Sequence, residues 1–153
     1  MKKKLVYLSA LCFLQFSWNC AAAFFEQRPL SFGTIAIRHN LSVSTLTIPA
    51  VGNSFSTNAL HIVQQGQPAE WVFSGYPAFT TLNISPVLPI DSSNGVGSNP
   101  QFKLTNLDIP SQVTVNGIGV ASVVVGATLE TSGTGGQYID TDYQFVIFLN
   151  VTY

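Results

Sequence analysis

Charged residues are scarce in this chain, at 8% of the sequence, against about 25% in an average globular domain. Apart from three lysines at the extreme N-terminus, only Arg28, Arg38 and Lys103 stand against seven acidic residues, a formal charge of about −4. Proteins that bind nucleic acid neutralise phosphates with clustered lysine and arginine, so no nucleic-acid partner is expected. A weakly charged surface hardly repels copies of itself, which fits an assembled extracellular protein and a compact secreted β protein equally well.

Cysteine and histidine are also rare, with two copies of each. Both cysteines, Cys12 and Cys20, lie near the N-terminus, so a chain that loses this segment has no thiol for a disulfide, a metal site or a nucleophile. A Ser-His-acid triad would have to use His39 or His61, and neither lies in a nucleophile motif. We therefore expect a non-enzymatic protein with no catalytic residues, no metal site and no cofactor.

One pair of carboxylates deserves a test for acid–base chemistry. Asp140 and Asp142 are two positions apart, so in a strand they would point the same way with Cα atoms about 6.5 to 7 Å apart. That spacing resembles the carboxylate pair of an inverting hydrolase only superficially. The preferred interpretation is a polar edge or bulge just before the last strand.

The N-terminus has the three parts of a secretory signal peptide. Lys2–Lys4 is basic, Leu5–Phe16 is apolar and Ala21–Ala23 is a run of small residues of the kind that precedes cleavage. A membrane anchor is the alternative, but the apolar run is shorter than the roughly 20 residues that a spanning helix needs. We expect residues 1–23 to be removed, leaving residues 24–153 as one secreted domain with no membrane span.

Beyond this segment the pattern is that of an all-β protein. No helical periodicity of useful length occurs, and turn residues recur about every 8 to 12 positions, as in sandwiches and barrels. In 69–74 the alternation predicts that Ala69, Trp71 and Phe73 are buried together. The other internal strands are expected at 30–37 (with a bulge near Gly33), 41–48, 59–64, 80–88, 101–107 and 113–130, the last as two strands or one bent strand.

The most regular strand pattern is at the C-terminus. A period of two over residues 143–153 puts one set of large apolar side chains on a single buried face. These residues are Tyr143, Phe145, Ile147, Leu149, Val151 and Tyr153. The pattern predicts a core strand of roughly 35 Å that crosses the domain. Val146 and Phe148 on the opposite face are apolar as well, and either a loop of the same domain or a neighbouring subunit is expected to cover them.

Several short motifs resemble an uncharacterised bacterial family of secreted, adhesin-like β-sandwich proteins. They are Leu30–Gly33, Phe73–Pro77, Val125–Leu129, Gly136–Tyr138 and Val151–Tyr153. The stretch 136–141 before the aromatic-ended last strand is also similar to the spore coat protein U family, to which archaic chaperone–usher pilins belong.

The resemblance implies an immunoglobulin-like antiparallel β-sandwich of pilin or adhesin type. In the pilin relatives a periplasmic chaperone holds the C-terminal strand, an outer-membrane usher exports the subunit, and strand donation between like subunits builds a fibre. The odd-numbered residues of 143–153 would then form the edge for assembly and for the chaperone. This chain differs in two ways, because without its expected signal segment it has no cysteine for a disulfide near its start, and only Phe24–Pro29 precedes the first expected strand.

Two functional hypotheses follow. The first is an exported structural or adhesive subunit of a pilus-like or biofilm-associated assembly, which passes through the periplasm to the cell surface or an extracellular fibre. The second is a soluble secreted binding module for a ligand such as a glycan, with Trp71, Tyr76 or Tyr138 as its aromatic platform.

Overall fold

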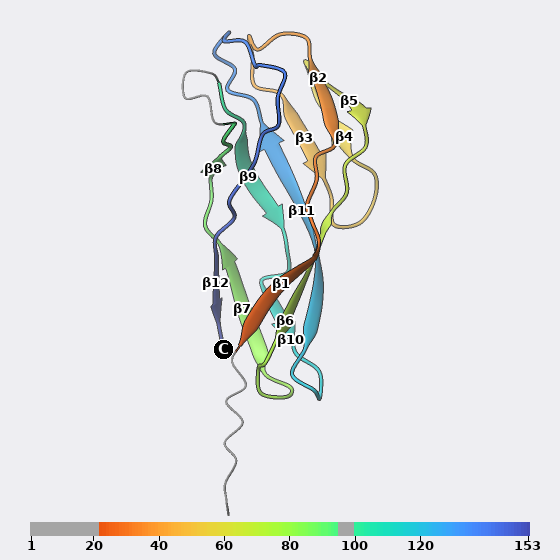
Figure 1. Cartoon of the computed structure of the whole chain (residues 1–153), viewed down its shortest axis with the longest axis vertical. Helices are drawn as coiled ribbons and strands as arrows, with labels where there is room; N and C mark the ends of the chain where they lie inside the picture. The colour runs from red at the N-terminus through yellow and green to blue at the C-terminus, as the bar shows by residue number, and fades with distance from the viewer. Residues whose placement is uncertain (1–21, 95–99) are drawn as a thin grey trace, which may run out of the picture.

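The computed structural model describes residues 22–94 and 100–153. Residues 1–21 of the expected signal segment therefore lie outside the described residues. The described chain is all-β, and its antiparallel sheets curl into a sandwich-like half-barrel (Figure 1). Its strands are β1 (Ala23–Arg28), β2 (Thr34–Ile37), β3 (Thr45–Ile48), β4 (Phe55–Ser56), β5 (Leu60–Gln64), β6 (Ala69–Ser74), β7 (Thr81–Pro86), β8 (Ile90–Asp91), β9 (Lys103–Asp108), β10 (Gln112–Thr114), β11 (Ala121–Glu130) and β12 (Leu149–Thr152). The same residues contain no helix long and apolar enough to cross a membrane.

The central strand is β11. Its first half pairs with β6, and its second half pairs with β3 on one edge and with β9 on the other. Side chains along it, such as Val125 and Ala127, are fully buried. A Cβ atom on Gly126 would collide with the backbone of Ile48 and Ala50, so glycine is needed where β3 lies closest.

A smaller sheet, with the order β10-β7-β12, covers the core from the other side. Leu82 and Ile84 of β7 pack in one cluster with Trp71 and Phe73 of β6. Trp71 is only 3% exposed, which confirms the burial that its alternation predicts. The core therefore lies between this sheet and the β6–β11 part of the large one, as in a sandwich.

Most internal strands lie where the apolar pattern predicts them, and β6 has the predicted bounds. The expected strand 113–130 is two strands, β10 and β11, separated by a turn. In place of the expected strand 30–37, strand β2 begins only at Thr34, because Gly33 has a φ of 74° and the β2–β5 register shifts beside it. The two-residue strands β4 and β8 were not predicted, since so short a segment carries no periodicity.

The prediction of a continuous core strand over 143–153 is wrong. Only β12 is a strand, the alternating side chains from Tyr143 to Val151 are half-buried, and Tyr153 is 72% exposed. The alternation itself is real, because each odd position through 151 is less exposed than its even neighbours. The segment lies along one margin of the half-barrel, where it has a partner on only one edge.

The N-terminal lead is also more ordered than the sequence suggests. It forms β1, which pairs with β6 as an added edge strand, although five of its six residues are exposed. Phe24 packs its ring against Trp71 and Phe73, with centroid distances of 5.5 Å to each. The start of β1 and the C-terminus lie at the same end of the molecule (Figure 1).

We predict that adjacent valines of β11 differ sharply in their effect on stability. Val125 is fully buried and Val124 is 37% exposed. Val125→Ala should lower the free energy of unfolding by about 2 to 3 kcal/mol, because it removes two buried methyl groups and leaves a cavity. Val124→Ala should cost well under about 1 kcal/mol. Urea unfolding measures both, and equal losses would contradict the central place assigned to β11.

Candidate functional site

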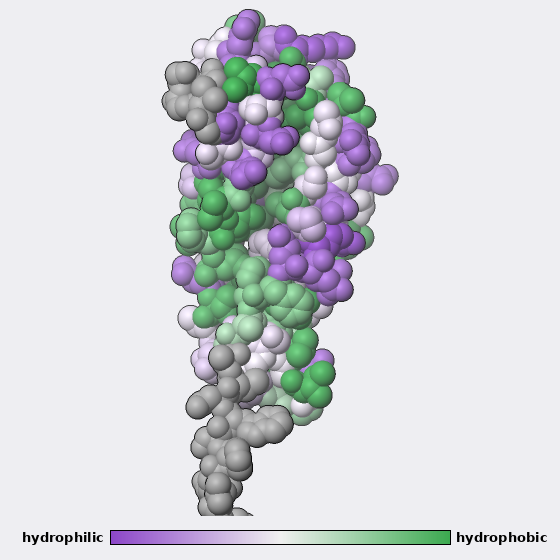
Figure 2. Space-filling view, in the orientation of Figure 1, coloured by the Kyte–Doolittle hydropathy of each residue, from purple (hydrophilic) through white to green (hydrophobic). Residues whose placement is uncertain are grey.

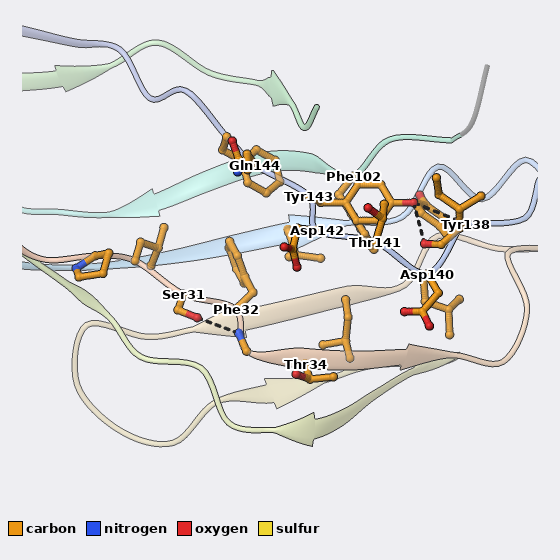
Figure 3. Close-up of a pocket in the computed structure, with 18 of the residues that line it drawn as sticks. Ser31, Phe32, Thr34, Phe102, Tyr138, Asp140, Thr141, Asp142, Tyr143 and Gln144 are labelled. Atoms are coloured by element: carbon orange, nitrogen blue, oxygen red, sulfur yellow. Dashed lines mark hydrogen bonds between the residues drawn. The ribbon is translucent and has the colours of Figure 1, made fainter. Parts of the chain in front are cut away.

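A groove in the described part of the chain lies between two segments from opposite ends of the sequence. One wall is residues 29–37 and the other is residues 138–147, and the groove has a volume of about 1050 Å³. Figure 3 shows Ser31, Phe32 and Thr34 on the first wall, facing the residues from Tyr138 to Gln144 on the second. We call this cavity the terminal groove.

Each wall of the terminal groove has strand partners on its outer edge only. On the first wall, Ser31 exchanges backbone hydrogen bonds with Gln67, and β2 pairs with β5. On the second wall, Gln144 exchanges bonds of 2.8 and 2.9 Å with Ser93. No strand pairs with the inner edge of either wall within the described residues. The groove is therefore bordered by two open backbone edges, which are templates for a further strand.

The floor and inner surfaces of the terminal groove are apolar. Phe102 and Leu129 are buried at its floor, and Ile35 and Ile147 line its sides. The rings of Phe32 and Phe145 meet across the groove with centroids 6.0 Å apart. Both rings pack against the two core clusters, so an apolar occupant would extend the existing core.

An aromatic cluster lines part of the groove. Phe102 stacks on Tyr138 at 4.4 Å and meets Tyr143 edge-on at 4.9 Å. The Tyr143 hydroxyl donates to the Ile139 carbonyl at 3.3 Å and accepts from the Ile139 N–H at 3.2 Å. These bonds close a bend over residues 139–142, directly before the segment for which the last strand was expected.

The two aspartates considered for acid–base chemistry lie in that bend. Asp140 and Asp142 are exposed on the rim of the groove, not side by side in a strand (Figure 3). Figure 2 shows one face of the molecule, on which hydrophilic residues gather at the upper end and at the right of the middle, and apolar residues gather at the left of the middle and below it. No group of three or more metal-ligating side chains occurs in the described ranges.

The two histidines lie outside the groove. His39 is exposed in the connection after β2, and His61 is on β5 opposite Ala36. The Nε2 atom of His61 is buried and has no hydrogen-bond partner in the described part of the chain. Neither histidine lines the groove, whereas Asp140 and Asp142 both do.

A buried amide that sequence analysis did not identify supports the second wall. Asn40 is 5% exposed; its Nδ2 donates to Ser132 Oγ and to the Gly136 carbonyl, and its Oδ1 accepts from the Gly133 N–H. It ties the loop that leads into Tyr138 to the chain after β2. Its only local signal is a turn-forming asparagine, which cannot reveal partners more than ninety positions away.

The aromatic residues proposed as a glycan platform are occupied inside the fold. Trp71 is buried beneath Phe24, and its Nε1 donates to Glu26 at 3.3 Å. Tyr138 is stacked on Phe102, and its hydroxyl donates to the Gln101 carbonyl and accepts from the Ser132 N–H. Tyr76 is half-buried against Tyr153. These three side chains do not form a shared open platform.

Five of the six residues proposed as an assembly edge divide between the groove and β12, and the sixth, Tyr153, lies with its ring against Tyr76. Tyr143, Phe145 and Ile147 line the terminal groove, whereas Leu149 and Val151 pack onto the core from β12. On the opposite face Val146 and Phe148 are 66% and 61% exposed, so the expectation that a loop of the same domain covers them is wrong. A contact of these two residues with another molecule stays a prediction.

Comparisons of the chain with protein-family models, with curated proteins and with solved structures found no match. The groove therefore has to be interpreted from its own geometry and chemistry.

We predict that Asn40→Ala loosens the second wall. The substitution leaves the Gly133 N–H and the Ser132 hydroxyl without their buried partner, which should cost about 1 to 3 kcal/mol of stability. Hydrogen exchange should accelerate most at Gly133. Asn53→Ala, at an exposed asparagine, is the control and should change neither quantity. Unchanged exchange at Gly133 in Asn40→Ala would show that this amide does not hold the wall.

Proposed function

We propose that this protein is an exported, non-enzymatic structural or adhesive subunit of a pilus-like or biofilm-associated surface assembly. The observation that carries the proposal is the terminal groove, an apolar trough bordered by two backbone edges without inner partners in the described chain. A strand from another molecule could hydrogen-bond to these edges and place alternate side chains on Phe102 and Leu129. The short motifs shared with secreted adhesin-like proteins and pilins support the same function.

The favoured occupant is an extended strand of a second copy of this chain. Segment β1 suits this role because it is an edge strand that pairs with β6 alone, and because Phe24 and Phe25 are each 50% exposed. Its six residues would span about 20 Å. Neighbouring side chains of a strand point to opposite faces, so one of the two phenylalanines would enter the groove, and its burial would contribute at most about 1.5 to 3 kcal/mol against the cost of leaving β6.

The proposal includes partners during export. A groove with open edges is prone to unwanted pairing, so a subunit in transit through the periplasm needs a companion that covers it. We infer a periplasmic chaperone that occupies the groove beside residues 143–147, followed by an outer-membrane usher and then by like subunits at the cell surface.

The proposal predicts that assembly depends on Ile147 and not on its neighbour Phe148. Ile147 lines the groove, whereas Phe148 points outward. Ile147→Ser should weaken self-association, and binding of a synthetic peptide of residues 22–30, about tenfold or more, because a polar group replaces an apolar contact in the groove. Phe148→Ser is the matched control and should assemble normally. Sedimentation velocity and fluorescence anisotropy measure the two effects.

Thermal unfolding first establishes that both variants fold. A wild-type protein that stays monomeric at every accessible concentration and does not bind the peptide would sink the assembly proposal. Equal weakening by Ile147→Ser and Phe148→Ser would place the contact somewhere other than the groove.

A further inference from the structure

The outer face of the small sheet carries a regular array of uncharged polar side chains. On β7, β10 and β12 the inward residues belong to the core, and the outward residues are exposed. The outward set is Thr81, Asn83 and Ser85 on β7, Gln112 and Thr114 on β10, and Asn150 and Thr152 on β12. We call this set the polar ladder. None of these three strands contains a charged residue.

Strand register aligns the polar ladder into rows. Gln112, Asn83 and Thr152 lie side by side in one row, because β10 and β12 both pair with β7 at Asn83. Thr114 lies opposite Thr81 in the row on one side, and Asn150 lies opposite Ser85 in the row on the other. Successive rows on one face of a sheet are about 7 Å apart and neighbouring strands about 4.8 Å apart. The result is a broad surface that alternates hydroxyl and amide groups.

Part of this hydrogen-bonding capacity is unused. Gln112 Nε2 donates to Asn83 Oδ1 at 2.8 Å, and the hydroxyls of Thr81 and Thr114 are 3.1 Å apart. The side chains of Ser85, Asn150 and Thr152 make no hydrogen bond to the part of the chain that the structure describes. Hydroxyl and amide groups both donate and accept, so they suit a ligand that does the same.

The next row changes from polar to apolar. Val87 lies two positions after Ser85, and Phe148 lies two positions before Asn150. The Val87 N–H donates to the Phe148 carbonyl at 3.0 Å. Phe148 is 61% exposed and Val87 is 48% exposed. An aromatic ring beside neutral hydroxyl and amide groups is a combination that suits a sugar, whose ring has an apolar face and a hydroxylated rim.

We propose that the polar ladder and Phe148 bind a neutral polysaccharide. An anionic or cationic partner would find no opposite charge on these three strands. A bilayer would bury seven polar side chains without hydrogen bonds, and a dry contact with the same face of a second copy would do so for many of them. A chain of neutral sugars can instead hydrogen-bond along the rows while one ring stacks on Phe148.

The binding test uses the purified protein and three neutral glycans as probes, namely dextran, amylose and cellulose, with alginate as an acidic comparison. The wild type should bind at least one neutral glycan and should not bind alginate. Phe148→Ala should weaken that binding about tenfold, as loss of a central aromatic contact does. Phe55→Ala, at a phenylalanine of similar exposure on β4, should leave it unchanged.

A second pair of variants tests the polar rows without removing an apolar side chain. Asn150→Asp puts a negative charge on the face and converts an amide donor to an acceptor, so binding should fall at least fivefold. Asn53→Asp makes the same change at an exposed position in the β3–β4 connection and should have no effect. Thermal unfolding checks that all four variants are folded.

Several outcomes would overturn the polysaccharide site. These are no binding to any of the three neutral probes, equal binding to alginate, and equal effects of a variant and its control. If Phe148→Ala instead lowers the sedimenting mass, the face is a contact between copies of the chain. The inference is separable from the assembly proposal, because the groove variant Ile147→Ser should bind the glycan as the wild type does.

Discussion

The structure depends on how completely each strand is hydrogen-bonded along its two edges. Strand β11 is paired on both edges over its second half, and the backbone approach at Gly126 lets β3 lie close to it. The core is most completely buried around this strand, with Val125 and Ala127 inaccessible to solvent. A strand with partners on both edges has its backbone N–H and C=O groups hydrogen-bonded and its side chains buried, so both forms of stabilisation occur at the same place.

The terminal groove is the place where this pairing stops. Its two walls come from the first and last parts of the described chain, and each is anchored on the outer edge alone, through Gln67 and β5 on one side and Ser93 on the other. Phe32 and Phe145 meet across the groove over an apolar floor. A groove of this kind is both a binding site and a liability, because open edges pair readily with any extended chain.

The two proposed surfaces use opposite faces of the same C-terminal segment. Ile147 faces the groove and the core, whereas Phe148 faces outward beside the polar ladder. Because neighbouring side chains of an extended chain point in opposite directions, one segment can serve subunit contact and ligand contact at once. A subunit that joins an assembly through its groove would thus keep the polar ladder exposed along the assembly, where many weak sites act together.

Much of the fold could be predicted from the sequence, and the site could be predicted only in part. The alternation in β6 predicts its bounds and the burial of Trp71, because one face of the strand meets the core. The same argument fails at residues 143–153. Period two reports which side chains share a face, but it does not report whether a neighbouring strand exists on each edge. Strand β1 was missed for the related reason that its stability comes from β6 and not from a pattern of its own.

The sequence by itself determined the all-β class, the scarcity of charge and the two faces of the C-terminal segment, since these follow from composition and from local side-chain direction. Only the tertiary structure decided that residues 29–37 and 138–147 border one groove, and that Asn40 holds the loop before Tyr138. It also decided that Gln112, Asn83 and Thr152 form one row. The physical reason is that strand order and register join segments far apart in the chain, and no local pattern records which segments will meet.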